Sequence, residues 1–248
     1  MLKWICFSKS ILFLSSMGSR LIVYGDIHGC LKELTLLRKS LNIQKSDIEV
    51  TVGDFLTKGK NSIGVLRYIQ QNNILSVLGN HEDKLHRFMM HQDNNNEKNP
   101  IILNDDEKKV VKGFSSDDIF FISKLPLFLR YGSITVLHAG LLNHQKLDSL
   151  SKKDEKRLLR LRYLDNKGKF LTIDQEDENS IFWADAYDGN EGFIVYGHQF
   201  FEEAYRSPNA LGIDTGCAYG NKLTAAIFID LDISNYTLCS MPATIRAV

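Results

Sequence analysis

The chain has 248 residues, enough for one large domain or two small ones. Lysine plus arginine and aspartate plus glutamate number 30 each, so a net charge of zero gives no overall attraction to nucleic acid or an acidic membrane. The four cysteines are widely spaced without a Cys-x-x-Cys pair, which argues against a zinc ribbon or a redox dithiol. We therefore expect reduced thiols and a cytoplasmic location.

The first 19 residues differ in character from the rest of the chain. An early lysine and several apolar residues faintly resemble a signal peptide, but Lys9 interrupts the apolar stretch. No segment approaches the ~20 apolar residues that a membrane span needs. Met17 lies just before the first expected strand. We therefore divide the chain into an N-terminal extension, residues 1–19, which a start site assigned too far upstream would explain, and one domain, residues 20–248.

The first third of the domain alternates between strands and helices. We expect strands at 20–24, 48–52 and 74–78, and the spacing of apolar residues predicts helices at 31–41 and 62–72. This alternation predicts a parallel sheet, in which ligands bind beyond the carboxyl ends of the strands. Each strand is followed by a polar loop that contains glycine: GDIHG, GDFLTKG and GNHE. These three loops should therefore meet at one edge of the sheet.

The remainder of the chain predicts a second sheet. A helix over 82–91 leads into an insertion at 91–118, Asn-rich at first and then charged, which fits a lid, a partner surface or an inert loop. From residue 126 short strands predominate, interrupted by a basic helix at 151–162 and a polar connection at 163–180. We place these later strands, including LTAAIFIDL and YTLCS, in a second, largely antiparallel sheet. The expected fold class is α/β, with two packed sheets and outer helices.

Seven potential ligands or proton donors follow the predicted strands: Asp26, His28, Asp54, Asn80, His81, His138 and His198. Mixed oxygen and imidazole ligands suit divalent manganese, iron or zinc. A carboxylate at the end of the middle strand can bridge two ions ~3.5–4 Å apart, which can clamp phosphoryl oxygens. The neighbouring glycines leave room for the backbone to approach ions and phosphate.

The ordered motifs GDIHG, GDFLTKG, GNHE, LHAG and YGH resemble those of the phosphoprotein phosphatase superfamily of metallophosphoesterases, over roughly residues 20–230. The resemblance implies a calcineurin-like αββα sandwich with mixed sheets. It also implies two divalent ions, manganese first, with iron or zinc as alternatives. Hydrolysis would then proceed by direct attack of a hydroxide that bridges the metals, without a covalent enzyme intermediate.

The resemblance assigns roles to individual residues. The metal ligands that it implies are Asp26 and His28 for the first ion, Asp54 as the bridge, and Asn80, His138 and His198 for the second ion. His81 would be the general acid for the leaving oxygen, or a donor to the phosphate. Lys58 would replace a phosphate-binding arginine, and Asn80 would also contact the phosphate. Arg162 is our candidate for a second phosphate clamp, with Arg160 as its rival.

The second motif departs from the usual GDxxDRG. Thr57 replaces the aspartate that would orient His81, and Lys58 replaces the arginine, which exchanges a two-pronged donor for a point charge. Both changes resemble the ApaH-like phosphatases. The segments RLRYLDNKGKF, FWADAYDG and GIDTGCAYGNKLTA resemble bacterial relatives described as serine/threonine phosphatases or bis(5′-nucleosyl)-tetraphosphatases.

The expected substrate is a phosphorylated small molecule or a phosphoprotein. An anhydride has a good leaving group and depends less on an oriented acid, so the neutral Thr57 favours a dinucleoside polyphosphate or polyphosphate. A serine/threonine phosphoprotein is the first alternative, and a catalytically weak metal-binding module is the second.

Several residues outside the motifs can be interpreted as either functional or structural. Asp214 either supports a ligating imidazole or forms a turn. Tyr219 either lies at the rim of the site and stacks on a base, or packs inside. Cys217 is better explained as buried packing than as a reactive thiol. Trp183 and Tyr187 are interpreted as core aromatics.

Overall fold

The computed structural model describes residues 19–92 and 99–244. Apart from Ser19, the predicted N-terminal extension lies outside the described residues, as do residues 93–98 of the predicted insertion. Within the two described ranges, no helix combines the length and the apolar character needed to cross a bilayer.

The first sheet has the strand order β12–β11–β1–β2–β3. Its strands are β1 (Arg20–Tyr24), β2 (Ile48–Thr51), β3 (Leu75–Ser76), β11 (Lys222–Ile229) and β12 (Tyr236–Pro242). The first three run parallel, as predicted, whereas β11 is antiparallel to both β1 and β12. The placement of LTAAIFIDL and YTLCS in the second sheet is therefore wrong. Ala226 and Phe228 of β11 face the other sheet while Ala225 and Ile227 face the helices, a two-sided burial that does not reveal the partner strand.

The second sheet has the order β4–β5–β8–β10–β9. Its strands are β4 (Phe128–Tyr131), β5 (Ile134–Leu137), β8 (Phe193–Tyr196), β9 (Tyr205–Ser207) and β10 (Ala210–Gly212). The β4–β5 and β9–β10 pairs are antiparallel, but β5–β8 and β8–β10 are parallel. The sheet is mixed, which confirms the fold class and corrects the expectation of a largely antiparallel sheet. A small antiparallel hairpin brackets the predicted polar connection: β6 (Tyr163–Leu164) lies at its start and β7 (Ile181–Phe182) directly after its end.

Seven α-helices occur in the described residues: α1 (Leu31–Ser40), α2 (Ser62–Gln71), α3 (Asn80–Gln92), α4 (Asp105–Lys112), α5 (Ser116–Ser123), α6 (Lys152–Leu158) and α7 (Trp183–Ala186). Three 3₁₀ turns accompany them: η1 (Leu147–Ser149), η2 (Ile173–Gln175) and η3 (Cys217–Tyr219). Helix α3 begins two residues before the predicted 82–91, so its first turn carries the Asn-His pair of the third motif. Helix α6 is shorter than the predicted 151–162.

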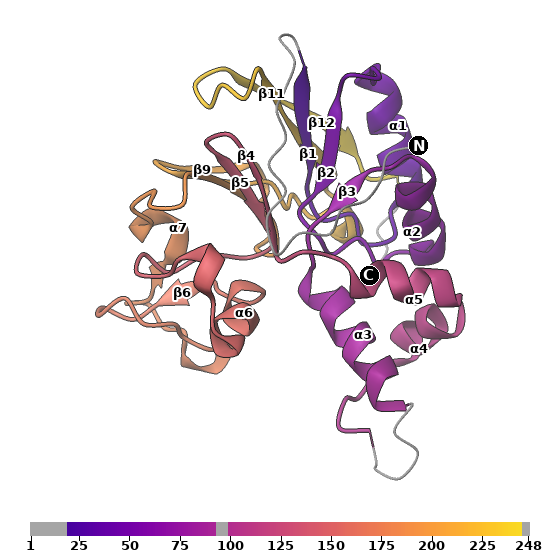
Figure 1. Cartoon of the computed structure of the whole chain (residues 1–248), viewed down its shortest axis with the longest axis horizontal. Coiled ribbons are helices and arrows are strands. Elements are labelled where there is room, and N and C mark those ends of the chain that lie inside the picture. The colour runs from indigo at the N-terminus through magenta and orange to yellow at the C-terminus, as the bar shows by residue number, and fades with distance from the viewer. Residues whose placement is uncertain (1–18, 93–98, 245–248) are drawn as a thin grey trace.

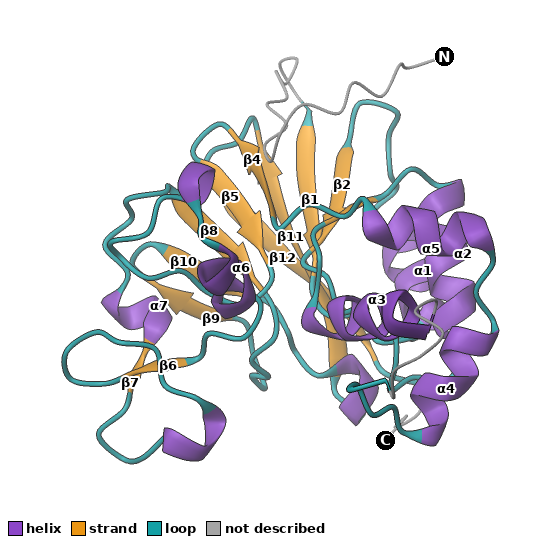
Figure 2. Ribbon diagram, turned by 60° about the horizontal axis from the view of Figure 1, so that its bottom comes forward, coloured by secondary structure: helices purple, strands orange, loops and turns teal. Residues whose placement is uncertain are grey.

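Three clusters of buried apolar side chains separate four layers. The first, with Leu34 of α1, lies between the helices and the first sheet. The second joins Val50 of β2 to Val136 of β5 between the two sheets. The third packs Trp183 and Tyr187, 1% and 3% exposed, beneath the second sheet, which confirms both as core aromatics. Figures 1 and 2 show this αββα arrangement, with α1–α5 beside the first sheet and α6 and α7 beside the second.

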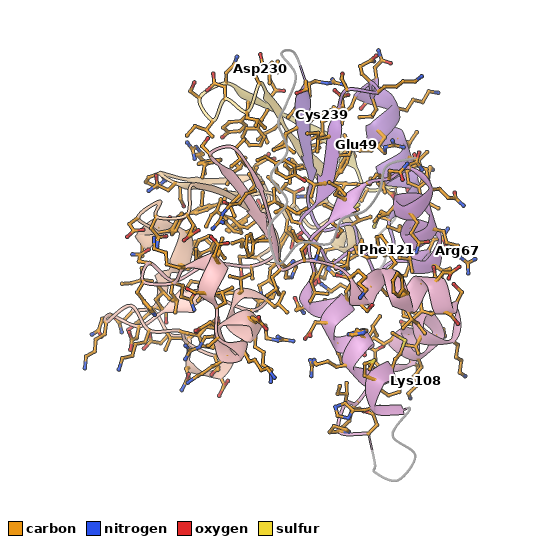
Figure 3. The ribbon with its side chains drawn as sticks, in the orientation of Figure 1. Glu49, Arg67, Lys108, Phe121, Asp230 and Cys239 are labelled. Atoms are coloured by element: carbon orange, nitrogen blue, oxygen red, sulfur yellow. The ribbon has the colours of Figure 1, made fainter. Side chains whose placement is uncertain are left out.

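A buried carboxylate ties the first helix to the first two strands. Glu49 of β2, labelled in Figure 3, accepts hydrogen bonds from the Tyr24 hydroxyl at 2.6 Å and from the Arg38 guanidinium at 2.7 and 2.8 Å. Such a charged, two-pronged pair has a defined geometry as well as a favourable energy. It fixes β1 and β2 relative to α1, and the loops after these strands hold the first part of the site.

Candidate metal centre and phosphate pocket

The polar residues predicted from the motifs come together at one edge of the two sheets. Asp26 and His28 follow β1, Asp54 follows β2, Asn80 and His81 begin α3, His138 follows β5 and His198 follows β8. We call six of them the ligand set: Asp26, His28, Asp54, Asn80, His138 and His198. Burial is nearly complete for Asp26, His28, Asp54 and His138, which are at most 3% exposed. Buried polar groups in this number require partners that compensate for lost water.

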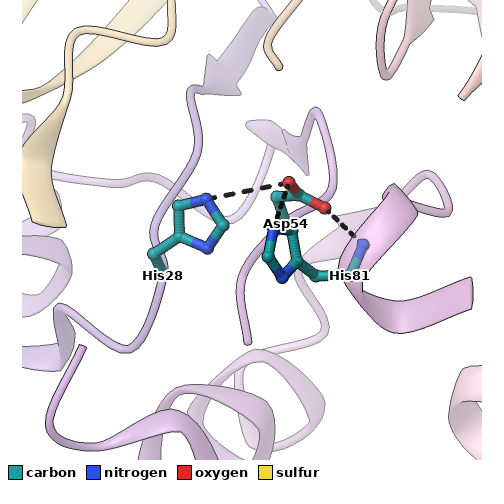
Figure 4. A group of neighbouring side chains, drawn as sticks. All are labelled: His28, Asp54 and His81. Atoms are coloured by element: carbon teal, nitrogen blue, oxygen red, sulfur yellow. Dashed lines mark hydrogen bonds and ion pairs between the residues drawn. The ribbon is translucent and has the colours of Figure 1, made fainter. Parts of the chain in front are cut away.

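Asp54 is shared by two groups of potential metal ligands. His28 and His81 complete one group, and His138 and His198 complete the other; within each group the ligand atoms all lie within 4.8 Å of one another. Nε2 of His28 and Nε2 of His138 are 3.7 and 3.5 Å from Oδ2 of Asp54. Figure 4 shows Asp54 between His28 and His81. A carboxylate common to two groups is what a bridging ligand of a two-metal site requires.

Backbone carbonyls orient two of the imidazoles. Nδ1 of His28 lies 2.8 Å from the carbonyl oxygen of Leu56, and Nδ1 of His138 lies 2.8 Å from that of Val52. Because a carbonyl oxygen only accepts, each Nδ1 carries the proton and each Nε2 directs a lone pair inward. Nε2 of His138 is then 2.9 Å from the side-chain oxygen Oδ1 of Asn80, so two acceptors face each other, a contact that a cation relieves.

The electrostatics of the site also fit a cation. Burial, together with the nearby carboxylates of Asp214 and Asp54, raises the pKa of Asp26 well above its ordinary value. Burial likewise raises the pKa of Asp214 to about 6. Burial lowers the pKa of His28 to about 3 and keeps this imidazole neutral near pH 7. Crowded carboxylates beside neutral imidazoles form a donor set for divalent metal ions.

Asp54 behaves differently from its neighbours. Burial opposes its ionisation, but His138, His81, His28 and the Lys58 ammonium outweigh burial and hold the pKa of this carboxyl below its usual range. Asp54 is therefore the ionised centre of the site.

Threonine 57 is the side-chain partner of His81. Its Oγ1 lies 2.8 Å from Nδ1 of His81, where a carboxylate would otherwise orient the ring. The His81 side chain is 22% exposed, and its Nε2 lies 3.8 Å from Oδ2 of Asp54. Burial lowers the pKa of His81 against the opposing effect of Asp54, so the ring is neutral near pH 7.

A cavity of about 210 Å³ opens over Asp54. Four partly exposed side chains that line it are called the rim: Lys58, Arg162, Phe200 and Tyr219. The ammonium of Lys58 lies 2.8 Å from Nε2 of His28 and 5.1 Å from the centre of the Tyr219 ring. Although burial opposes its charge, Asp54 and Tyr219 raise the pKa of Lys58 above its ordinary value. The cavity therefore combines a buried anionic centre with fixed positive charge, as phosphoryl chemistry requires.

The structure distinguishes between the two arginines that were considered as phosphate ligands. Arg162 lines the cavity, and its buried Nε has no hydrogen-bond partner within the described part of the chain. Its backbone oxygen accepts from the Trp183 amide at 3.0 Å, which holds the segment after α6 in place. Arg160 is absent from the cavity lining and forms an ion pair with Asp83 at 3.1 Å.

The sequence matches the family described as calcineurin-like phosphoesterase over residues 19–232, most of the chain. The chain belongs to the calcineurin-like phosphoesterase family. This result confirms the predicted family and fold class. It also establishes the protein as a metal-dependent hydrolase of phosphoric esters or anhydrides, because members of this family use divalent metals.

Comparison with known proteins places this phosphoesterase near tetraphosphatases. Proteins named bis(5′-nucleosyl)-tetraphosphatase PrpE [asymmetrical] are similar to it. That of Oceanobacillus iheyensis is 30% identical, and the match covers 83% of this chain and 87% of the relative. That of Bacillus subtilis is 28% identical, and the match covers 85% of this chain and 91% of the relative. A crystal structure described as a candidate diadenosine tetraphosphatase superposes with a TM-score of 0.77 at 25% identity, covering 96% of this chain and 99% of the other. A Saccharomyces cerevisiae serine/threonine phosphatase, with a TM-score of 0.63 at 16% identity over 95% and 84%, shares the fold.

The ligand set of this phosphoesterase contains strained backbone and two loops that lie very close together. His28, Asp54 and His198 have left-handed φ values of 43°, 50° and 67°. Non-glycine residues adopt this region at an energetic cost, which surrounding structure must offset. A Cβ atom on Gly197 would lie 1.9 Å from Oδ1 of Asp26, so the YGH motif needs its glycine to bring the two loops together.

Glu82 supports the Asp54 loop, a contact that the sequence did not predict. It is completely buried, and its carboxyl oxygens accept hydrogen bonds from the amides of Asp54 at 2.7 Å and Leu56 at 2.9 Å. The glutamate thus holds the loop that presents Asp54. It is the last residue of the GNHE motif, so its position beside the candidate ligands was the available signal.

Two residues with alternative interpretations lie in or near the cavity. Asp214 lines the cavity, and its Oδ1 accepts a hydrogen bond from the Gly216 amide at 3.0 Å. This residue therefore forms a turn and also lies at the site. Cys217 is 1% exposed and packs with Cys30 in the first apolar cluster, as predicted for a packing residue.

Proposed function

We propose that this phosphoesterase hydrolyses a phosphoanhydride bond of a dinucleoside polyphosphate. The ligand set would hold two divalent ions, Asp26 and His28 at the first, Asn80, His138 and His198 at the second, with Asp54 between them; manganese is the ion we expect. When bound, the ions neutralise phosphoryl charge and activate water for in-line attack. The observation that supports Asp54 as the shared ligand is its place in two groups of imidazoles, one with His28 and the other with His138 and His198.

The rim supplies two cationic contacts for the polyphosphate. Lys58 gives a point charge next to the ligand set, and its raised pKa keeps it charged. Arg162 brings a guanidinium whose buried Nε lacks a protein acceptor among the described residues, and a phosphate oxygen is the acceptor such a donor fits. The carboxamide of Asn80 lines the same cavity and can also contact the phosphate.

The partner of His81 supports an anhydride as the bond cleaved. Thr57 offers a neutral hydroxyl at 2.8 Å, so nothing at Nδ1 stabilises an imidazolium. A neutral His81 can donate a hydrogen bond to a leaving oxygen but is a weak acid. A leaving nucleotide phosphate is stable as an anion and requires little protonation, whereas the hydroxyl of serine or threonine requires a proton.

The relatives named PrpE bear the term asymmetrical. Asymmetrical cleavage of diadenosine tetraphosphate gives ATP and AMP, and symmetrical cleavage gives two ADP. We expect ATP and AMP from this chain. A cytoplasmic location is part of the proposal, supported by the free thiols of Cys30, Cys217 and Cys239.

A substrate panel tests the proposal. Purified protein with Mn²⁺ should hydrolyse diadenosine tetraphosphate with a kcat/KM at least tenfold above that for a phosphothreonine peptide. A clear preference for the peptide would reject the anhydride assignment in favour of protein phosphatase activity. Bound Mn²⁺ without turnover of any substrate, p-nitrophenyl phosphate included, would instead identify a metal-binding module.

A further inference from the structure

Two aromatic rings stand exposed at the rim. Phe200 and Tyr219 are each 41% exposed, and their ring centres are 5.9 Å apart at an angle of 59°. Both line the cavity whose other walls are largely charged or polar. Large apolar side chains exposed beside a polar site often mark a surface that another molecule covers.

The Phe200 ring and the two loops that carry both rings are held in place before any ligand arrives. A Cβ atom on Gly216 would lie 2.3 Å from a ring carbon of Phe200, so this ring packs directly on the Gly216 backbone. The Phe201 amide donates a hydrogen bond to the backbone carbonyl oxygen of Asp214 at 2.9 Å, which connects the Phe200 loop to the loop that carries Tyr219. Because these contacts already restrict the Phe200 ring and the two loops, stacking of a ligand costs less conformational entropy of the protein.

A positive charge lies next to the two rings. The Lys58 ammonium lies over the Tyr219 ring at 5.1 Å, within the range of a cation–π contact. A molecule that extends from the phosphate contacts of Lys58 toward the exterior therefore passes next to Tyr219. Flat aromatic surface beyond a phosphate site complements a nucleotide, in which a planar base follows the phosphate and the sugar.

The size of the cavity places the base outside it. At about 210 Å³, the cavity is smaller than the ~300–1,000 Å³ of sites that enclose drug-sized ligands. It can admit phosphoryl groups, but a dinucleoside polyphosphate must extend across the rim.

We propose that Phe200 and Tyr219 form a nucleobase-binding surface that holds one base of the substrate. This inference rests on the proposed function and narrows it, because inorganic polyphosphate has nothing to place on the two rings. Stacking of a base on an aromatic side chain contributes about 5- to 150-fold in affinity.

The test replaces each ring by an aliphatic side chain of similar bulk. Phe200→Leu and Tyr219→Leu should each lower the kcat/KM ratio of diadenosine tetraphosphate to inorganic tripolyphosphate by about 5- to 50-fold, mainly through KM for the dinucleotide. Phe120→Leu is the matched control, because Phe120 is 64% exposed on α5 and absent from the cavity lining. This control should change the ratio less than twofold. Thermal unfolding midpoints verify that all three variants fold.

A second measurement does not depend on dinucleotide turnover. With p-nitrophenyl phosphate as reporter and Mn²⁺ present, AMP should inhibit the wild type at least fivefold more strongly than inorganic phosphate does. Either leucine variant at the rim should lose most of that difference. If AMP inhibits no better than phosphate, or if both rim variants retain the wild-type ratios, the base surface is wrong. If AMP shows the advantage but diadenosine tetraphosphate is not hydrolysed, the base surface stands and the proposed substrate fails.

Discussion

The ligand set and the rim border the same cavity but are constructed in different ways. In the ligand set, Asp26, His28, Asp54 and His138 are at most 3% exposed, backbone carbonyls hold the Nδ1 protons of His28 and His138, and three residues adopt left-handed backbone. At the rim, Phe200 and Tyr219 are 41% exposed, and Arg162 retains a donor without a partner among the described residues. The contrast fits two tasks under the proposed function: the fixed interior would set the chemistry, and the exposed rim would select the molecule on which that chemistry acts.

The largest expected effect comes from removing the charge at the centre of the ligand set. Asp54→Asn should lower kcat for p-nitrophenyl phosphate by on the order of 10³-fold or more, because both groups of ligands share this carboxylate. The same exchange at Asp105→Asn, where the aspartate is exposed on α4 and paired with Lys108, should leave kcat within twofold. A kcat loss below tenfold in Asp54→Asn would contradict a shared ligand.

The arginine at the rim, Arg162, gives the next largest effect. Arg162→Ala should lower kcat/KM for diadenosine tetraphosphate by on the order of 10²-fold, as expected for the loss of a charged hydrogen bond to the reacting phosphate. Arg160→Ala removes an equal charge two residues away, but Arg160 is paired with Asp83, so the loss should stay below about threefold. Equal losses in the two variants would show that only general positive charge matters.

Restoring a carboxylate next to His81 should shift the substrate preference. In Thr57→Asp, the carboxylate would raise the pKa of His81 and improve proton donation to poor leaving groups. The kcat/KM ratio of the phosphothreonine peptide to diadenosine tetraphosphate should rise by about tenfold. Thr57→Val, which removes the hydroxyl without adding charge, should not raise this ratio. An unchanged ratio in Thr57→Asp would exclude His81 protonation as the basis of selectivity.

The smallest effect concerns the glutamate beneath the Asp54 loop. Burial and Asp54 raise the pKa of Glu82 from 4.5 to about 8, so between these values the folded chain retains a proton that the unfolded chain releases. Through Glu82, wild-type stability therefore falls as pH rises across this window. The measurement is the thermal unfolding midpoint in the presence of a metal chelator. The midpoint of the wild type minus that of Glu82→Gln should decrease by a few degrees from pH 5 to pH 9. A constant difference across that range would contradict the assignment.

The sequence predicted that the candidate ligands would meet at one edge of the sheet, but it assigned β11 and β12 to the wrong sheet. Asp26 and Asp54 follow apolar strands directly, and parallel strands bring their ends to one edge, so local pattern was sufficient. Strand β11 is apolar on both faces, and nothing in such a pattern says which sheet it joins.

Two contacts at the site could be identified only from the structure, because spacing along the sequence does not specify them. Arg160 and Arg162 are only two residues apart and both follow the end of α6, so spacing along the chain does not tell which one lines the cavity. Glu82 acts by accepting backbone amides of Asp54 and Leu56, a contact between distant segments that sequence spacing does not encode.

The count of bound ions tests the account most directly. Equilibrium dialysis of the metal-free wild type against Mn²⁺, followed by metal analysis, should give two ions per chain, with activity appearing only as the second ion binds. Asp54→Asn should weaken both sites together. A folded wild type that saturates with one ion at full activity, or that turns over substrate in excess chelator, would contradict the two-metal centre.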